Sequence, residues 1–157
     1  MITNGHEERY IKSTTFDDQV ESILENLFET KIKWATKTED MYQHIDLWID
    51  NIPVGVRGQH LRYKRFFDNA LNLRDTEVSL MFLEDDSVNK LEPKLFFVYL
   101  FDNGKILNWK LLDMHELHIF TLRQRHENMK LGGPKHEPFI NVYFNEATDV
   151  VLLEQKL

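Results

Sequence analysis

The sequence predicts a mixed α/β (α+β) fold in which a central mixed β-sheet is flanked by helices. Two helical patterns enclose a series of short segments rich in β-branched and aromatic residues, and tight-turn signals separate several of these segments. The 157 residues fit a single domain, 1–157. A hydrophobic content of 42% with 29% charged residues is typical of a globular chain and not of a disordered one.

The first element is an amphipathic helix that begins at Thr14 or Thr15, either of which can cap it. Asp17 and Asp18 fall in the first turn, where the helix dipole favours acidic side chains. The apolar residues that follow recur at helical spacing and form one stripe: Val20, Ile23, Leu24, Leu27 and Phe28.

Three strands are predicted next, at 31–36, 44–50 and 52–59. In the second, apolar Ile45, Leu47 and Ile49 alternate with polar or amphipathic residues, as expected for a strand with one buried face. Asp50-Asn51 is suited to a tight turn, so the second and third strands are expected to form a hairpin.

The remainder of the chain predicts further strands and one more helix. The basic and aromatic segment 60–75 is predicted as a loop or short helix, and 77–85 as a strand. A buried strand at 95–102, a turn at Asn103-Gly104 and a partner strand at 105–113 form a second hairpin. A helix at 114–127, a Gly/Pro loop at 128–138 and a final strand with a tail at 139–155 complete the prediction.

The composition excludes several classes of site and setting. The chain has no cysteine, so disulfides, thiolate zinc sites and cysteine nucleophiles are excluded, and a reducing compartment is favoured. The N-terminal segment lacks the pattern of a signal peptide, and the longest apolar run, 95–101, is too short to span a bilayer. We therefore expect a soluble, cytoplasmic protein without a membrane partner. The net charge of −7 argues against indiscriminate binding to nucleic acid.

The hairpin at 44–59 places Asp46 and Arg57 on neighbouring strands. Hydrolysis of a phosphodiester with Mg²⁺ needs oxygen ligands that converge on one point, and paired strands can supply them. Asp46 lies on the first strand; Gly55 and Arg57 share one face of the second, because strand side chains alternate.

This hairpin resembles the motif strands of the PD-(D/E)XK nuclease-like superfamily, especially its small phage- and bacteria-borne members. In that family an apolar-Asp-apolar strand and a tight turn precede a strand that carries a second acid and a lysine. Asp46 matches the first acid, and "VGVRG" at 54–58 matches the frame of the second strand. The segment 95–120 resembles the family's closing strands and following helix. The resemblance therefore implies a restriction-endonuclease-like core at about 16–120, with a C-terminal extension at 121–157.

The resemblance implies a Mg²⁺ or Mn²⁺ site, but this chain departs from the motif at two positions. Gly55 has no side chain to replace the second acid, and Arg57, which is always protonated, is a poor substitute for the lysine. If the site is active, the resemblance implies that Asp46 is a metal ligand, and the candidates for a second acid are Glu25, Glu39, Glu21, Asp40 and Glu77. Arg57 would stabilise charge on the phosphate, and Gln59 would assist through its carbonyl oxygen.

The densest positive run in the chain follows this hairpin. His60, Arg62, Tyr63, Lys64 and Arg65 combine phosphate-binding cations with an aromatic side chain, which favours a nucleic-acid interface. The alternative is a solvated loop whose aromatic residues pack on the core. A second basic group could extend the surface: Arg123, Arg125, Lys130 and Lys135.

Two further patterns favour ordinary structural roles. His115 and His118 have a spacing that zinc sites use, but no third ligand follows at a recognisable distance, so surface or helix-end histidines are expected. The tryptophans are expected to pack in the core or on a sheet face; Trp48 shares a face with Asp46 and would line a site there.

Three hypotheses remain open at this point. The chain is a nucleic-acid enzyme or its descendant with an altered metal site; it is a non-catalytic binding protein, such as a phage or mobile-element factor that engages a host protein; or it is an unrelated α/β domain. The resemblance also implies a homodimer.

Overall fold

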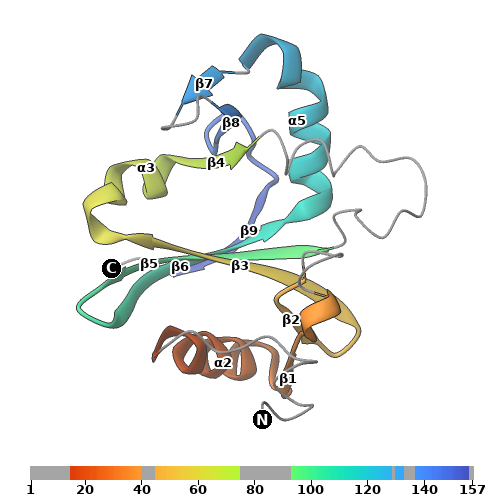
Figure 1. Cartoon of the computed structure of the whole chain (residues 1–157), viewed down its shortest axis with the longest axis vertical. Coiled ribbons are helices and arrows are strands. Elements are labelled where there is room, and N and C mark those ends of the chain that lie inside the picture. The colour runs from red at the N-terminus through yellow and green to blue at the C-terminus, as the bar shows by residue number, and fades with distance from the viewer. Residues whose placement is uncertain (1–14, 40–44, 75–92, 129, 133–136, 156–157) are drawn as a thin grey trace.

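The computed structural model describes residues 15–39, 45–74, 93–128, 130–132 and 137–155. These residues form a six-stranded mixed sheet and a three-stranded sheet, together with helices on both sides of the larger sheet. Figure 1 shows α2 below the six-stranded sheet and the smaller sheet with α3 and α5 above it. The predicted mixed α/β class is confirmed.

Helix α2 spans Thr15–Phe28 as predicted, with Asp17 and Asp18 in its first turn. Val20 and Leu24 of the apolar stripe are fully buried. The helix ends where Glu29 adopts a positive φ of 54°, a left-handed conformation that commonly terminates helices. Amphipathic spacing thus fixes both the helix and the face that it buries.

The six-stranded sheet has the order β1-β2-β3-β5-β6-β9. Its strands, in chain order, are β1 (Ile32–Trp34), β2 (Leu47–Ile49), β3 (Ile52–His60), β5 (Leu95–Asp102), β6 (Lys105–Asp113) and β9 (Val151–Gln155). Only β3 and β5 pair in parallel; the other neighbours are antiparallel. A parallel pair needs a crossover, which the chain makes through residues 61–94.

Both predicted hairpins are confirmed. Asp50, with φ 52°, begins the turn between β2 and β3, where Ile49 aligns with Ile52. Asn103 and Gly104 both have positive φ, 50° and 74°, as a type I′ turn requires. These two turns set the register of the sheet, because the pairing of antiparallel strands follows from the geometry of the loop.

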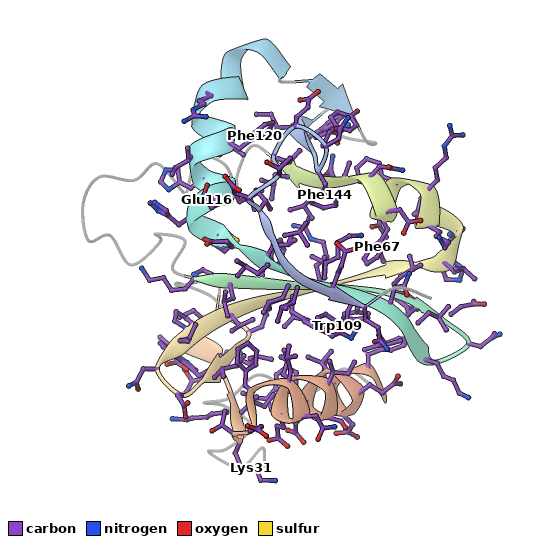
Figure 2. The ribbon with its side chains drawn as sticks, turned by 180° about the vertical axis from the view of Figure 1, so that it is seen from behind. Lys31, Phe67, Trp109, Glu116, Phe120 and Phe144 are labelled. Carbon is purple, nitrogen blue, oxygen red and sulfur yellow. The ribbon has the colours of Figure 1, made fainter. Side chains whose placement is uncertain are left out.

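The six-stranded sheet is covered on both faces, so the molecule has two apolar cores. The core against α2 includes Leu24, Leu47 and Phe97, all fully buried. The core on the other face includes Leu100 and Ile140, also fully buried. Figure 2 shows the same division: Trp109 lies on the side of α2, whereas Phe67, Phe120 and Phe144 lie on the opposite side of the six-stranded sheet. Burial on both faces explains why β5 is apolar at nearly every position.

The second layer corrects three predictions. It contains the 3-10 helix η2 (Leu61–Tyr63), α3 (Lys64–Asn69), β4 (Ala70–Arg74), α5 (Met114–Asn128), β7 (Lys130–Gly132) and β8 (Glu137–Tyr143). The segment 60–75 is a short helix only as far as Asn69, after which it forms β4. The predicted loop 128–138 includes β7. The predicted final strand 139–155 is two strands, β8 in the smaller sheet and β9 in the larger one.

These errors have two physical causes. β7 spans only three residues, which is too short for an alternating pattern to show, and it pairs with the nearby β8. β4 pairs with β8 as well, but there the partner lies far along the chain. Leu71 and Leu73 of β4 align with Val142 and Ile140 of β8, and only this pairing gives their alternation a buried face. The predicted helix at 114–127 is confirmed by α5. The predicted strand at 77–85 lies outside the described residues.

Within the described residues, no helix has both the length and the apolar content needed to cross a membrane.

Candidate functional site

Asp46 lies immediately before β2 and is bound to the strands on both sides. Its backbone N–H donates to the Val54 carbonyl at 2.9 Å, and its carbonyl accepts from the Ala35 N–H at 3.0 Å. Its side-chain Oδ2 accepts from the Val56 N–H at 2.6 Å. A charge-assisted bond of this length holds the carboxylate against the backbone of β3. The acid assigned to metal binding by the resemblance therefore has a structural partner in the motif strand itself.

Gly55 and Arg57 lie on β3 beside Phe96 of the neighbouring strand. A Cβ built on Gly55 would lie 3.3 Å from Cδ1 of Phe96 and 3.7 Å from Cγ of Pro93. The Arg57 guanidinium carbon lies 5.0 Å from the centre of the Phe96 ring, a cation–π distance. Arg57 Nη1 also donates to the backbone carbonyl of Asn72 in β4. Arg57 thus connects the two sheets, and Gln59, two residues further along β3, is half-buried.

The acids proposed as second ligands also have structural partners. Glu25 Oε2 accepts from the Ile32 N–H at 3.0 Å, at the start of β1. Glu39 Oε1 accepts from the Thr36 N–H at 2.8 Å, while the Glu39 N–H donates to Thr36 Oγ1 at 3.1 Å. This reciprocal pair is a capping box. Glu21 accepts from the indole N–H of Trp34 at 3.0 Å.

The described acids do not gather into a metal site. In the described ranges, no three histidine, aspartate or glutamate side chains form a group that could hold a metal ion. Two of the proposed second acids, Asp40 and Glu77, lie outside those ranges. The Mg²⁺ or Mn²⁺ site therefore stays a prediction from the resemblance. We derive no metal-dependent reaction step from Asp46, Glu25 and Glu39, whose side chains bind backbone N–H groups.

His60 ends β3 and anchors the turn that follows. Its Nδ1 accepts from the Arg62 N–H at 3.0 Å, and its Nε2 lies 3.2 Å from the Asp102 carboxylate. Both ring nitrogens are engaged, which fixes a tautomer with the proton on Nε2 when the ring is neutral. In this arrangement the imidazole positions η2 and has no free nitrogen to act as a general base.

The basic run after His60 forms a single exposed surface, which we call the Arg62–Arg65 surface: Arg62, Tyr63, Lys64 and Arg65. All four residues are exposed, and Tyr63 retains 50% of its accessible area. The Arg62 guanidinium carbon lies 5.4 Å from the Tyr63 ring centre. Lys64 pairs with Asp68 at 2.6 Å. The structure thus brings the predicted residues together on η2 and α3, with the aromatic Tyr63 among the cations.

The alternative interpretation, that the aromatic residues of this segment pack on the core, is right for Phe67 and wrong for Tyr63. Phe67 is 3% exposed and packs in the core between the two sheets. Tyr63, by contrast, points away from any core cluster and is among the most exposed large apolar residues of the described chain. The segment is therefore helical and not a loop. Phe67 is buried in the core, whereas the residues of the Arg62–Arg65 surface, just before it along the chain, are exposed.

The other predicted candidates are scattered. On α5, His115 is exposed and His118 is half-buried. Arg123 is exposed, while the side chains of Arg125, Lys130 and Lys135 lie outside the described part of the chain. Trp34 and Trp109 are core residues, as expected, at 7% and 9% exposure, and Trp48 is half-buried.

Sequence reasoning missed two buried polar residues of β6. Lys110 is 5% exposed, and its Nζ donates to the Phe67 carbonyl at 2.7 Å. Asn108, two residues earlier on the same face, is 3% exposed. The sequence contained one signal that could have predicted their burial. Asn108 and Lys110 alternate along the strand in step with the apolar Leu112, so all three point to the same buried face.

Comparison with protein-family models and with curated proteins found no match for this chain.

Proposed function

We propose that this protein binds nucleic acid through the Arg62–Arg65 surface, on a nuclease-like frame whose hydrolytic chemistry is altered. The observation that carries the proposal is the exposure of Arg62, Tyr63 and Arg65 together on the turn that follows the motif strand β3. Guanidinium groups bind phosphate in a bidentate manner, and an exposed aromatic ring offers a platform for a base.

The contacts of the hairpin support binding over cleavage. The Asp46 carboxylate holds the Val56 N–H, and the Arg57 guanidinium holds the Asn72 carbonyl. Gly55 adds no oxygen ligand. A catalytic role for Asp46 and Arg57 would require these contacts to be shared with a metal or a phosphate.

The charge distribution supports a local rather than a general interface. The whole chain carries a net charge of −7, so phosphate attraction depends on where the cations lie. Lys64 is paired with Asp68, which reduces its contribution. Arg62 and Arg65 therefore carry most of the expected electrostatic attraction. We also infer a cytoplasmic setting, which the lack of cysteine supports.

The test is the salt dependence of binding to a labelled single-stranded oligonucleotide, followed by fluorescence anisotropy. Replacing Arg62 and Arg65 by alanine removes two phosphate contacts, so the slope of log K against log salt should fall by about 1.4. Lys33→Ala, which removes an exposed cation on β1, on the opposite side of the molecule from α3 (Figure 1), is the control and should leave the slope unchanged. An unchanged slope in the double variant, or no binding by the wild-type protein, would overturn the proposal and favour a protein partner.

A parallel incubation with Mg²⁺ or Mn²⁺ tests the chemistry. We expect binding without cleavage. Asp46→Asn keeps an oxygen acceptor for the Val56 N–H but removes the charge that a metal ligand needs. Metal-dependent cleavage by the wild-type protein that is lost in a folded Asp46→Asn variant would show instead that the site is active. Sedimentation of the same samples tests the homodimer that the resemblance implies.

A further inference from the structure

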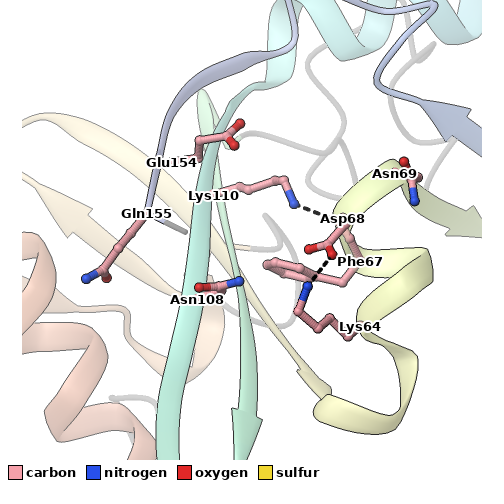
Figure 3. Close-up of a pocket in the computed structure, with 8 residues that line it drawn as sticks. All are labelled: Lys64, Phe67, Asp68, Asn69, Asn108, Lys110, Glu154 and Gln155. Atoms are coloured by element: carbon pink, nitrogen blue, oxygen red, sulfur yellow. Dashed lines mark hydrogen bonds and ion pairs between the residues drawn. The ribbon is translucent and has the colours of Figure 1, made fainter. Parts of the chain in front are cut away.

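A hollow of about 330 Å³ lies between α3 and the edge of the six-stranded sheet formed by β6 and β9. Lys64, Asp68 and Asn69 line it from α3, and Asn108, Lys110 and Glu154 line it from the two strands. Figure 3 shows Asn108, Lys110 and Glu154 on the strands, with Lys64 and Asp68 facing them from α3. Lys64 belongs both to this hollow and to the Arg62–Arg65 surface.

The formal charges that line the hollow cancel. On α3, Lys64 and Asp68 form an ion pair at 2.6 Å. On the strands, Lys110 contributes one positive charge and Glu154 one negative charge. An ionised phosphate placed inside would meet two carboxylates, whereas an uncharged polar group would meet donors and acceptors of both kinds. The hollow therefore suits the uncharged part of a ligand.

Lys110 gives the hollow a rigid floor. Its Nζ donates to the Phe67 carbonyl at 2.7 Å and lies 3.9 Å from the centre of the Phe67 ring. A second ring, Phe144, lies 5.2 Å away. A buried ammonium held by a carbonyl and two aromatic faces is positioned before any ligand arrives, which lowers the entropic cost of binding.

Asn108 supplies a polar group whose hydrogen bonding is incomplete. Its side chain is 3% exposed, and its Oδ1 is buried without a hydrogen-bond partner among the described residues. Buried oxygens of this kind are uncommon, because an unsatisfied acceptor destabilises the fold. No hydrogen bond holds Oδ1 in place, so a rotation of the carboxamide can turn it into the hollow toward a ligand N–H.

We infer that the hollow takes the base of an unpaired nucleotide, whose phosphate lies on the adjacent Arg62–Arg65 surface. The inference rests on the proposed function and adds to it a preference for strands with accessible bases. An unstacked base is uncharged, carries donors and acceptors on its edges and can be read by a carboxamide such as that of Asn108. The volume of the hollow is at the lower end of the range of small-molecule pockets, which suits one base.

The experiment compares a single-stranded oligonucleotide with a strand of the same length that has abasic sites, using the full chain and anisotropy at one salt concentration. The two strands have the same phosphates and differ only in their bases, which can enter the hollow or stack on Tyr63, so a variant of the hollow is needed to separate the two contributions. The wild-type protein should bind the strand with bases about tenfold more tightly, the worth of roughly one good hydrogen bond. Asn108→Leu, which has similar volume but no polar atoms, should remove the part of this preference that the hollow supplies, so that the ratio of the two affinities falls without a change in the salt slope.

Asn26→Leu is the matched control, because Asn26 is exposed on α2, across the six-stranded sheet from the hollow. If Asn108→Leu does not fold, Gln155→Ala, an exposed position that also lines the hollow, replaces it. Equal binding of both strands by the wild-type protein, with a salt slope that still depends on Arg62 and Arg65, would overturn the inference and leave the proposed function intact. No binding of either strand would overturn both.

A last experiment tests whether the base that enters the hollow belongs to a nucleic-acid strand or to a free nucleotide. Ligand-detected NMR with cytidine monophosphate should show weak binding that disappears in Asn108→Leu. Strong binding of the free nucleotide together with no binding of the oligonucleotide would overturn the strand as the source.

Discussion

The Arg57 guanidinium in β3 donates a hydrogen bond to the backbone carbonyl of Asn72 in β4, and this contact ties the six-stranded sheet to the three-stranded sheet. The same side chain stacks 5.0 Å from the Phe96 ring centre. Asn72 is itself fixed by a hydrogen bond from its Nδ2 to Asn141 Oδ1 at 2.9 Å. The residue at the lysine position of the motif thus has a structural role at the junction of the two layers.

Replacing Arg57 should therefore destabilise the protein. Arg57→Met keeps an unbranched apolar stem but leaves the Asn72 carbonyl without this donor, so we expect the free energy of unfolding to fall by about 1–3 kcal/mol. Arg57→Lys should recover part of the loss, since an ammonium can reach the carbonyl but stacks less well. Urea denaturation measures both. Unchanged stability combined with weaker oligonucleotide binding would indicate that Arg57 contacts phosphate instead.

Asp46 should contribute to stability through its bond to the Val56 N–H. Asp46→Ala removes the acceptor at 2.6 Å, and we expect a loss of about 1–3 kcal/mol. Asp46→Asn should lose less than Asp46→Ala, because it retains an oxygen that can accept from the Val56 N–H. It should still lose some stability, because the bond is no longer charge-assisted. Thermal unfolding of the two variants gives the comparison. If both melt as the wild type does, the Asp46 carboxylate has no structural role in the hairpin.

Gly58 is required by the close approach of Tyr99. A Cβ on Gly58 would lie 2.6 Å from Tyr99 Cζ and 2.7 Å from its hydroxyl oxygen, and the ring is only 9% exposed. Gly58→Ala should cost about 1–3 kcal/mol, because the ring must move within a packed core. Gly55→Ala is the matched control. The Cβ added at Gly55 would lie 3.3 Å from Cδ1 of Phe96, which is a less severe overlap, so we expect a smaller loss of stability.

A second-site change tests the cause of that loss. Tyr99→Leu removes the ring atoms that a Cβ on Gly58 would meet, so Gly58→Ala should cost less in a Tyr99→Leu background. Denaturant unfolding of the four proteins of this cycle gives the coupling energy. Equal costs of Gly58→Ala in both backgrounds would contradict the steric explanation.

Glu39 should behave as a capping residue. Glu39→Gln keeps an oxygen for the Thr36 N–H and should leave stability nearly unchanged, whereas Thr36→Ala should cost about 1 kcal/mol. Thermal unfolding with and without Mn²⁺ distinguishes this role from metal binding. Stabilisation by Mn²⁺ that Glu39→Gln abolishes would show that Glu39 is a ligand.

The elements that the sequence predicted correctly are those whose signal is local. Val20 and Leu24 indicate the buried face of α2 from their spacing within the helix itself. Asn103-Gly104 indicates the turn between β5 and β6 from two adjacent residues. β4 was missed because its partner, β8, lies far along the chain. β7 was missed because it spans only three residues, inside a segment rich in glycine and proline. The Arg62–Arg65 surface was predicted because its members are consecutive, and the hollow was not, because Lys64 and Lys110 meet only in the folded chain.

The sequence by itself determined the mixed α/β class, the two hairpins and the place of the basic run, since these depend on hydrophobic periodicity and turn chemistry within short segments. Only the tertiary structure decided what Asp46 and Arg57 contact, because the Val56 N–H and the Asn72 carbonyl are brought to them by strand pairing and by the packing of the second layer. A motif fixes residue types and their order. The partners of a polar side chain depend on distances between segments, which the sequence pattern does not contain.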